Sequence, residues 1–332
     1  MGKIKKRGIF FTFIAITIMA VFILVFAPSA DVGLQKDIQS VKVRIASVDG
    51  YVGDLKGRYF ETILRATTYK AVLSLISYIN STGSFVGDID SAFYEISLNG
   101  TLNGMPIDDL TGKKIMDNNT ISNWTKRVAQ TAGSTLNVNT TIIVTNISIY
   151  QDKPWAVDSS LALSLLVKSN VAEWNDNITI TTTMSIEGFH DPYYLVNTNK
   201  AYTNRLKRSS IPFDQWNISK VREHLRNGTY VENPRAPSFL MRFSNTISSS
   251  GCCGIESLVN PNSISVSDQR ESYVDYLFWQ HDYNPAANCT KLYNITNPST
   301  GGGLWDEFEY FKLDISHVID YNITSEDAVG NC

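Results

Sequence analysis

The stretch LQKDIQSVKVRIASVDGYVGDLKGRYFETILRATTYKAVLSLISYI, residues 34–79, decides the fold. In its first half, apolar side chains recur at alternating spacings of four and three residues, which is typical of a helix with one apolar seam. The seam consists of Leu34, Ile38, Val41, Ile45, Val48, Val52, Leu55 and Tyr59. After Tyr59 the pattern becomes broadly apolar, as in a helix that enters a globular core. We therefore expect an amphipathic helical spine over 28–80 whose seam contacts another helix.

Three glycines lie on the face of this predicted helix opposite the seam. Gly50, Gly53 and Gly57 are spaced by three and four residues, and a glycine inside a helix costs about 1 kcal/mol relative to alanine. One interpretation is the close approach of a neighbouring backbone at these positions. The other is a helix that is locally loosened or interrupted. The spacing is compatible with both.

An apolar run precedes the spine. From Ile9 to Ala27 nineteen residues carry no charge, and four basic residues come before them: Lys3, Lys5, Lys6 and Arg7. The length approaches the roughly 20 residues of a membrane span, and the charge asymmetry places the N-terminus in the cytoplasm. We expect a single-pass transmembrane helix over 9–27, a charged cytoplasmic segment over 1–8 and an extracellular remainder. A cleaved signal peptide and a buried core helix are the alternatives.

Composition narrows the class of protein. The 332 residues carry a formal net charge of −3, which argues against nucleic acid as a partner. The four histidines, His190, His224, His281 and His317, are too scattered along the sequence to form a metal site by local spacing. The sequence has no HExxH, GxSxG or P-loop motif. We therefore expect no metal, no cofactor and no enzymatic activity.

Acceptor motifs for N-glycosylation are more frequent than chance predicts. Twelve Asn-x-Ser/Thr motifs occur, at Asn80, Asn99, Asn118, Asn123, Asn139, Asn146, Asn177, Asn217, Asn227, Asn288, Asn294 and Asn322. Such acceptors must lie on exposed backbone outside the cytoplasm. The motifs therefore predict a glycoprotein of the cell surface.

All four cysteines lie in the distal third of the chain: Cys252, Cys253, Cys289 and Cys332. An even number in an oxidising compartment predicts two disulfides. Because a bridge between adjacent residues would be strained, we expect Cys252 and Cys253 each to pair with Cys289 or Cys332. Zinc is the alternative, but adjacent cysteines lack the spacing of a structural zinc site.

The residues after the spine predict a β-rich head over 81–189. Two Asn-Gly pairs indicate short strands and turns over 85–107. Three further segments alternate apolar and polar residues, and each should bury one face in an antiparallel meander packed on the spine. Their inward residues are Ile143, Thr145, Ile147 and Ile149; Leu161, Leu163, Leu165 and Val167; and Ile178, Ile180, Thr182, Met184 and Ile186. Asn146 should face away from the first of these sets.

Residues 190–332 hold all the cysteines and are expected to form a second lobe. We expect a helix from near Asp214 to Gly228, strands over 238–245 and 272–283, and mixed helix and turn over 305–323. The predicted fold class is α+β: a long N-terminal helix, membrane-spanning and then amphipathic, followed by a β-rich, mainly antiparallel head.

Two short motifs suggest chemistry. Asp88-Ile89-Asp90 is a DxD triplet, which in a type II membrane-anchored, glycan-modifying enzyme would supply metal ligands. This enzyme is the alternative to a non-enzymatic surface protein. The basic run from Arg205 to Arg208 would be a processing site in a viral or eukaryotic type II glycoprotein, although a solvated loop is the commoner meaning of such a run.

The N-terminal residues resemble a known family. Lys5-Lys6-Arg7-Gly8, followed at once by the apolar run, is similar to the class III signal of archaeal type IV pilins and related surface proteins. The resemblance implies cleavage after Gly8, with Ile9 as the first mature residue, and a helix capped by a β-rich head. It implies a membrane-anchored, N-glycosylated protein of the cell surface that acts in filament assembly or adhesion.

The resemblance also defines the expected partners. These are membrane lipid, further copies or related pilin-like subunits that contact the N-terminal helix, and a surface glycan or a partner cell as the target of adhesion.

Overall fold

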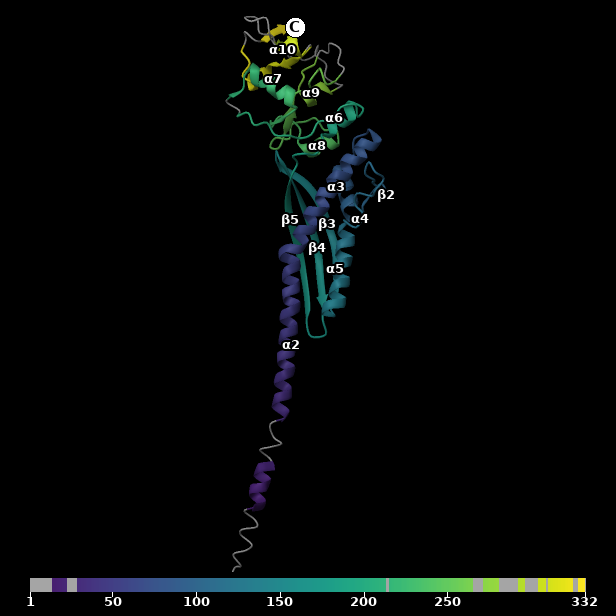
Figure 1. Cartoon of the computed structure of the whole chain (residues 1–332), viewed down its shortest axis with the longest axis vertical. Helices are drawn as coiled ribbons and strands as arrows, with labels where there is room; N and C mark the ends of the chain where they lie inside the picture. Colours follow the sequence, from purple (N-terminus) through teal and green to yellow (C-terminus); the bar gives the residue numbers. More distant parts are fainter. Residues whose placement is uncertain are drawn as a thin grey trace, which may run out of the picture.

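The computed structural model describes residues 14–22, 29–212, 215–264, 271–280, 292–295, 304–308, 310–324 and 328–331. Side chains of the long helix are described from Ile38 onward. Figure 1 shows a helix that projects from an elongated head, with the C-terminal part of the chain at the end of the molecule farthest from this helix.

The spine consists of α2 (Ser29–Asp54), a π-helical turn (Leu55–Tyr59) and α3 (Phe60–Thr82), which follow one another without a gap. The spine ends at Gly83, whose φ of +70° favours glycine and whose backbone N–H donates to the carbonyl of Ile79. The helix therefore covers almost the whole of the predicted 28–80 segment.

The predicted transmembrane helix over 9–27 is wrong. The first helix in the structure covers only nine residues, 14–22. Among the described residues, no helix is both long enough and apolar enough to cross a membrane. A span needs about 20 apolar residues in one helix, and the helix formed here is less than half that length. Residues 9–13 and 23–27 of the predicted segment lie outside the described part of the chain.

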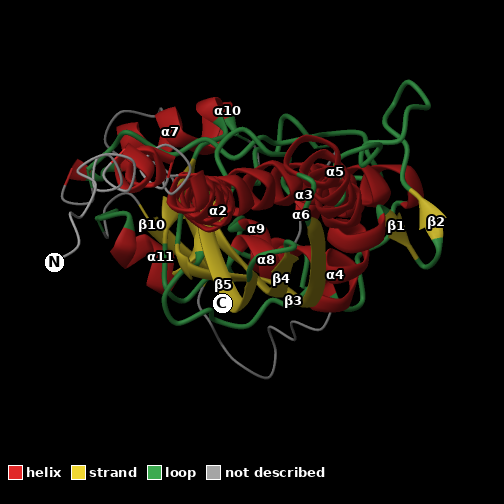
Figure 2. Cartoon of the chain, turned by 90° about the horizontal axis from the view of Figure 1, so that it is seen from below, coloured by secondary structure: helices red, strands yellow, loops and turns green. Residues whose placement is uncertain are grey.

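Three antiparallel strands pack on the spine: β3 (Asn139–Lys153), β4 (Ala156–Lys168) and β5 (Glu173–Ser185). Their order in the sheet is β3-β4-β5, which confirms the predicted meander. Figure 2 shows the long helices as a layer on one side of these strands. Leu161 and Leu163 of the central strand are buried on this side.

A β-bulge in β3 changes which side chains face the helices. Thr145 is inserted between two residues of β3 that pair with consecutive residues of β4. The insertion reverses the alternation, so that Ile147 and Ile149 are 2% and 3% exposed whereas Ile143 is 59% exposed. The prediction of one inward face from Ile143 to Ile149 is therefore wrong at Ile143, which lies on the opposite side of the sheet, and at Thr145, which is exposed in the bulge.

The head contains more helix than the sequence predicts. Strands and turns are expected over 85–107, but α4 (Ile89–Asn99) forms there, followed by the small hairpin of β1 (Thr101–Leu102) and β2 (Met105–Pro106). A further helix, α5 (Ile121–Leu136), packs on β3. Both Asn-Gly pairs form turns as predicted: Gly100, with a φ of +77°, ends α4, and Asn103 and Gly104, both with positive φ, connect β1 to β2. The prediction misses only the helix α4, which buries Phe93 in the core.

The second lobe is made of short elements: α6 (Pro192–Asn197), α7 (Ile218–Asn227), β6 (Tyr230–Glu232), α8 (Phe239–Phe243), β7 (Ile255–Ser257), α9 (Asp275–Phe278), β8 (Leu292–Ile295), α10 (Leu304–Glu307), β9 (Lys312–Asp314), α11 (Ile315–Asp320) and β10 (Ala328–Asn331). The helix predicted to end at Gly228 is confirmed as α7. The strands predicted over 238–245 and 272–283 are wrong, because α8 and α9 form there. Ser238 starts α8 by accepting the backbone N–H of Met241.

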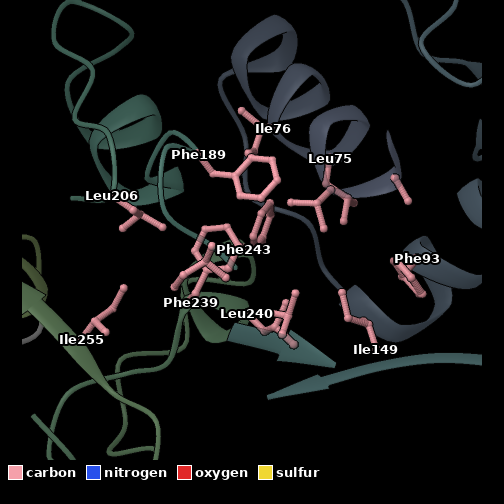
Figure 3. Packing of buried hydrophobic residues seen from close by; sticks show 14 of the residues in the cluster. Leu75, Ile76, Phe93, Ile149, Phe189, Leu206, Phe239, Leu240, Phe243 and Ile255 are labelled. Carbon is pink, nitrogen blue, oxygen red and sulfur yellow. The ribbon is translucent and has the colours of Figure 1, made fainter. Parts of the chain in front are cut away.

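One hydrophobic core connects the spine to the second lobe. Figure 3 shows Leu75 of α3 beside Phe189, Phe239 and Phe243. The ring centroids of Phe239 and Phe243 lie 5.0 Å apart, and those of Phe189 and Phe239 lie 6.2 Å apart. The backbone N–H of Val86 also donates to the carbonyl of Phe243. These contacts fix the second lobe to the end of the spine.

Candidate functional site

The seam on the spine divides into two halves, and the upper half is buried in the chain's own head. Val48, Val52 and Leu55 are 1%, 3% and 3% exposed, and Tyr59 is partly buried against the same core. In this half the head takes the place of the partner helix that the pattern predicts.

Polar contacts from the end of α2 and from the π-helical turn hold the spine against the sheet. The ammonium group of Lys56 lies 2.8 Å from a carboxylate oxygen of Asp176 on β5. The indole of Trp174, also on β5, donates to Asp49 at 3.3 Å. The position of the head on this part of the spine is therefore set by charge and hydrogen bonding as well as by apolar packing.

The lower half of the seam is exposed to solvent in the part of the chain that the structure describes. Ile38, Val41 and Ile45 are 53%, 38% and 36% exposed, and we call these three residues the lower seam. The side chain of Leu34 lies outside the described ones. In Figure 1 the lower part of α2 extends beyond the strands of the head. Val41 lines a groove whose other wall includes Leu136 and Val171.

The helix over 14–22 is also apolar, and its side chains are exposed among the described residues. Its exposed large side chains are Ile14, Ile16, Ile18, Met19, Val21 and Phe22. Full burial of one such side chain contributes roughly 1.5–3 kcal/mol. Contiguous apolar surface of this kind marks an interaction surface. The predicted processing position at Gly8 and Ile9 lies outside the described residues.

Three of the spine's glycines, Gly50, Gly53 and Gly57, do not approach another described part of the chain. A Cβ atom added at Gly50, Gly53 or Gly57 would meet no described atom within 4 Å. Gly57 lies in the π-helical turn, where the helix is locally wider. Within one molecule the structure thus agrees with a loosened helix at Gly57.

The predicted glycosylation sites lie at the surface wherever the structure describes them. Eight asparagines are exposed: Asn99, Asn118, Asn139, Asn146, Asn177, Asn217, Asn227 and Asn322. Asn80, Asn123 and Asn294 are partly exposed, and Asn288 lies outside the described residues. Each described motif therefore presents its acceptor at least partly to solvent.

The cysteine pairing differs from the expected one. A disulfide joins Cys252 to Cys253, so neither cysteine pairs with Cys289 or Cys332, which lie outside the described residues. Both bonded cysteines lie in the loop before β7, and Cys253 is buried at 1% exposure.

The DxD triplet serves as a helix cap. Asp88 precedes α4, and its carboxylate accepts the backbone N–H groups of Asp90 and Ser91 and the hydroxyl of Ser91. Within the described part of the chain, no group of three or more His, Cys, Asp or Glu side chains could hold a metal ion. The arrangement at Asp88 thus has a structural explanation.

The basic run from Arg205 to Arg208 is held in ordered backbone pairing. Arg205 pairs with His190 and Arg208 with Tyr230 as isolated β-bridges. The guanidinium of Arg208 forms an ion pair of 2.7 Å with Glu232. A protease needs an extended, accessible segment, so this pairing disfavours cleavage at Arg208.

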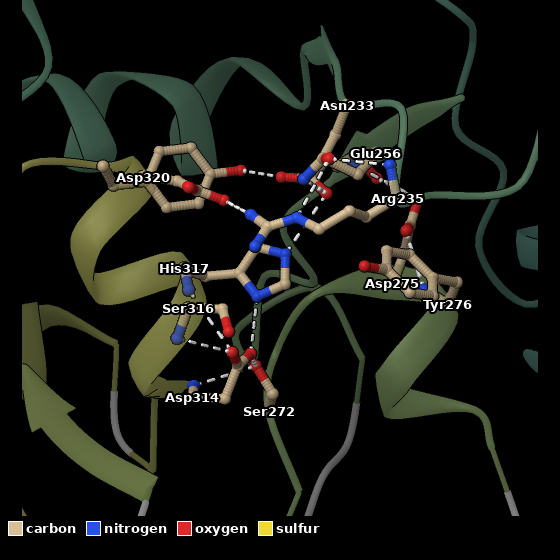
Figure 4. A network of polar contacts seen from close by, with 12 residues as sticks. Asn233, Arg235, Glu256, Ser272, Asp275, Tyr276, Asp314, Ser316, His317 and Asp320 are labelled. Atoms are coloured by element: carbon tan, nitrogen blue, oxygen red, sulfur yellow. Dashed lines mark hydrogen bonds and ion pairs between the residues drawn. The ribbon is translucent and has the colours of Figure 1, made fainter. Parts of the chain in front are cut away.

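A buried ionic cluster in the second lobe is a titratable site that the sequence does not predict. His317 lies between two carboxylates: its Nδ1 is 2.6 Å from Asp314 and its Nε2 is 3.3 Å from Glu256 (Figure 4). Tyr321 donates to Glu256 at 2.9 Å, and Ser272 donates to Asp314 at 2.8 Å. Only the Asp314–His317 spacing is visible in the sequence, because Glu256 is distant along the chain.

Charge balance determines the protonation of this cluster. Burial alone would lower the pKa of His317, but the charge of Glu256 and the hydrogen bond to Asp314 outweigh burial and raise it to about 10. Burial opposes ionisation of Asp314, but its hydrogen bond with His317 lowers its pKa to about 2. A cavity of about 230 Å³ adjoins the cluster. Because its carboxylates are already engaged, the cluster is suited to holding the lobe together.

Comparison of the chain with protein-family models, with curated proteins and with solved structures finds no match.

Proposed function

We propose that this chain is a pilin-like protein of the cell surface, which acts in surface filament assembly or adhesion by associating with further copies of itself. The assembly surface is the lower seam of α2, continued by the helix over 14–22. The observation that carries the proposal is the exposure of Ile38, Val41 and Ile45 on a helix that extends beyond its own head.

A second copy of the same chain is the occupant that fits this surface. When two copies lie side by side in the same direction, each presents the same apolar seam, with 4-3 spacing, to the other. Their heads then lie at one end and their 14–22 helices at the other. This seam-to-seam contact is isologous and joins two copies, so a filament needs in addition a heterologous contact that repeats without closure.

Two further observations support a location at the cell surface. The described acceptor asparagines are all at least partly exposed, as glycan attachment outside the cytoplasm requires. The sequence from Lys5 to Gly8 also resembles a pilin leader. A filament subunit needs no catalytic site. In the candidate metal-binding pair Asp88 and Asp90, the carboxylate of Asp88 caps a helix.

The decisive experiment places charges in the lower seam. The double variant Ile38→Asp/Ile45→Asp adds two carboxylates to apolar positions that the head does not use. Val52 is unsuitable for this purpose because it is 3% exposed in the head's core. The matched control is Val43→Asp, since Val43 is 70% exposed and lies about 160° around the helix from Ile45.

We expect the double variant of the full-length protein to associate at least ~100-fold more weakly, the equivalent of about 3 kcal/mol. Sedimentation and chemical crosslinking measure association, and thermal unfolding checks that the head is intact. Val43→Asp should associate like the wild type. The proposal fails if the wild type stays monomeric, if the double variant forms wild-type oligomers, or if Val43→Asp is equally disruptive.

A further inference from the structure

Within the described part of the chain, the three-stranded sheet has one face without a covering layer. The helices pack on the side that buries Leu161 and Leu163. The opposite side chains form what we call the open face. It consists of Asn139, Thr141, Ile143, Asn146, Ser148 and Tyr150 on β3; Asp158, Ser160, Ala162, Ser164, Leu166 and Lys168 on β4; and Glu173, Asn175, Asn177, Thr179, Thr181 and Thr183 on β5.

The asparagine and the hydroxyl residue of the glycosylation motif are two residues apart, which is the spacing of side chains on one face of a strand. Successive side chains of a strand point to opposite faces, so residues i and i+2 share a face. Asn-x-Ser/Thr therefore presents its acceptor and its hydroxyl on one side. On β5, Asn177 and Thr179 are both exposed on the open face. On β3, Asn146 is exposed there beside Ser148.

The bulge in β3 brings a third motif to this face. Asn139 and Asn146 are seven residues apart, and an odd separation would place them on opposite sides of a regular strand. Because Thr145 is an extra residue between them, both asparagines lie on the same side of the sheet and are exposed on the open face. The same bulge turns Ile143 out of the core to 59% exposure.

The register places this isoleucine among the acceptors. Ile143 pairs with Ser164, which in turn pairs with Asn177. Asn146 pairs with Ala162, in the adjacent row of the sheet. Neighbouring strands lie about 4.8 Å apart, so Asn177 is roughly 10 Å from Ile143 across the sheet. A sugar attached to either asparagine is within reach of the exposed apolar side chain.

We propose that Asn139, Asn146 and Asn177 carry N-linked glycans, which together form a carbohydrate layer over the open face and cover Ile143. In the attachment step, Nδ2 of the asparagine attacks the anomeric carbon of an oligosaccharide linked to a lipid phosphate. A C–N bond forms, the C–O bond to the phosphate breaks, the amide nitrogen loses one proton, and the lipid phosphate leaves. The inference requires export of the chain but does not depend on the lower seam.

Two measurements test this layer. The first is mass spectrometry of glycopeptides from the protein purified from its own cells, which should show glycans at all three asparagines. The second uses the variant Asn146→Gln/Asn177→Gln, which should bind a hydrophobic dye several-fold more strongly and aggregate faster. Adding Ile143→Thr to this variant should restore wild-type dye binding, because the uncovered apolar side chain is gone.

The control variant is Asn99→Gln/Asn227→Gln, which removes two exposed motifs at the ends of α4 and α7, neither of which belongs to the open face. It should leave dye binding unchanged. Unmodified Asn146 and Asn177 in the native protein would overturn the inference, as would a sheet variant that behaves like this control. Association through the lower seam should be the same in every variant, so failure here is distinguishable from failure of the assembly proposal.

Discussion

Nη1 of Arg242 lies 2.6 Å from a carboxylate oxygen of Asp191, and both side chains are completely buried. The same nitrogen lies 2.8 Å from Asp275, and the guanidinium is stacked 4.8 Å from the ring centre of Tyr193. Arg242 belongs to α8, Asp191 caps α6 and Asp275 begins α9. One buried cation therefore ties three helices of the second lobe together.

Removing the charge of Arg242 should lower the free energy of unfolding of the second lobe more than removing any surface charge. Arg242→Met leaves two buried carboxylates without their partner, which costs about 3–5 kcal/mol. The control is Arg208→Met, because Arg208 pairs with Glu232 at the surface, where an ion pair contributes less than about 1 kcal/mol. Urea unfolding measures both variants, and equal losses of stability would contradict the role of the buried cluster.

Two buried histidines should make the stability depend on pH in opposite directions. His317 has a pKa of about 10 in the folded protein against an ordinary 6.5, so the folded protein keeps a proton that the unfolded chain releases. Its stabilisation is complete below pH 6.5 and is lost as the pH rises towards 10. Burial lowers the pKa of His224 to about 4. Its contribution is present above pH 6.5 and is lost as the pH falls towards 4.

The variants His317→Asn and His224→Asn separate these two effects. His317→Asn should flatten the decline of unfolding free energy between pH 6.5 and 10, and His224→Asn should flatten the decline between pH 6.5 and 4. Each variant serves as the control for the other. Melting temperatures across pH 4–10 provide the measurement, and an alkaline limb that persists in His317→Asn would show that Glu256 and Asp314 do not hold the imidazolium.

The disulfide between Cys252 and Cys253 should contribute little to stability. Loop-closure entropy grows with the number of residues that a bridge encloses, and this bridge joins neighbours with a sequence separation of 1. We expect Cys252→Ser/Cys253→Ser to change the unfolding free energy by less than about 1 kcal/mol. Peptide mapping of the unreduced protein identifies the bridge. A loss of several kcal/mol, or a bridge from Cys253 to a distal cysteine, would contradict this connectivity.

The sequence predicts those parts of the fold that depend on local periodicity. The strands β4 and β5 follow from their strict alternation, and the spine follows from its seam. The seam records only which face of the helix is apolar, so its buried residue Val52 and its exposed residue Ile38 look alike in the sequence. What covers each of them depends on the head, which is built from residues far along the chain.

The incorrect predictions from the sequence have two physical causes, which are the pairing between strands and the capping of helix ends. The bulge at Thr145 appears only when β3 is aligned with β4, and without it Ile143 is indistinguishable from a core residue. The helix α4 starts because Asp88 caps it, whereas the DxD spacing suggests a metal site. The sequence does not reveal the cluster around His317, because Glu256 is distant from His317 in the sequence and comes close to it only in the folded chain.

The glycines of α2 provide the last test, because alanine distinguishes their two interpretations. Added methyl groups at Gly50 and Gly53 would meet no described atom within 4 Å, and an exposed glycine inside a helix costs up to about 1 kcal/mol. Gly50→Ala/Gly53→Ala should therefore raise the unfolding free energy by about 1–2 kcal/mol, as measured by urea denaturation. Because the lower seam lies on the other side of α2, association measured by sedimentation should not change. A variant that is more stable but no longer associates would show instead that a neighbouring backbone packs against these glycines in the assembly.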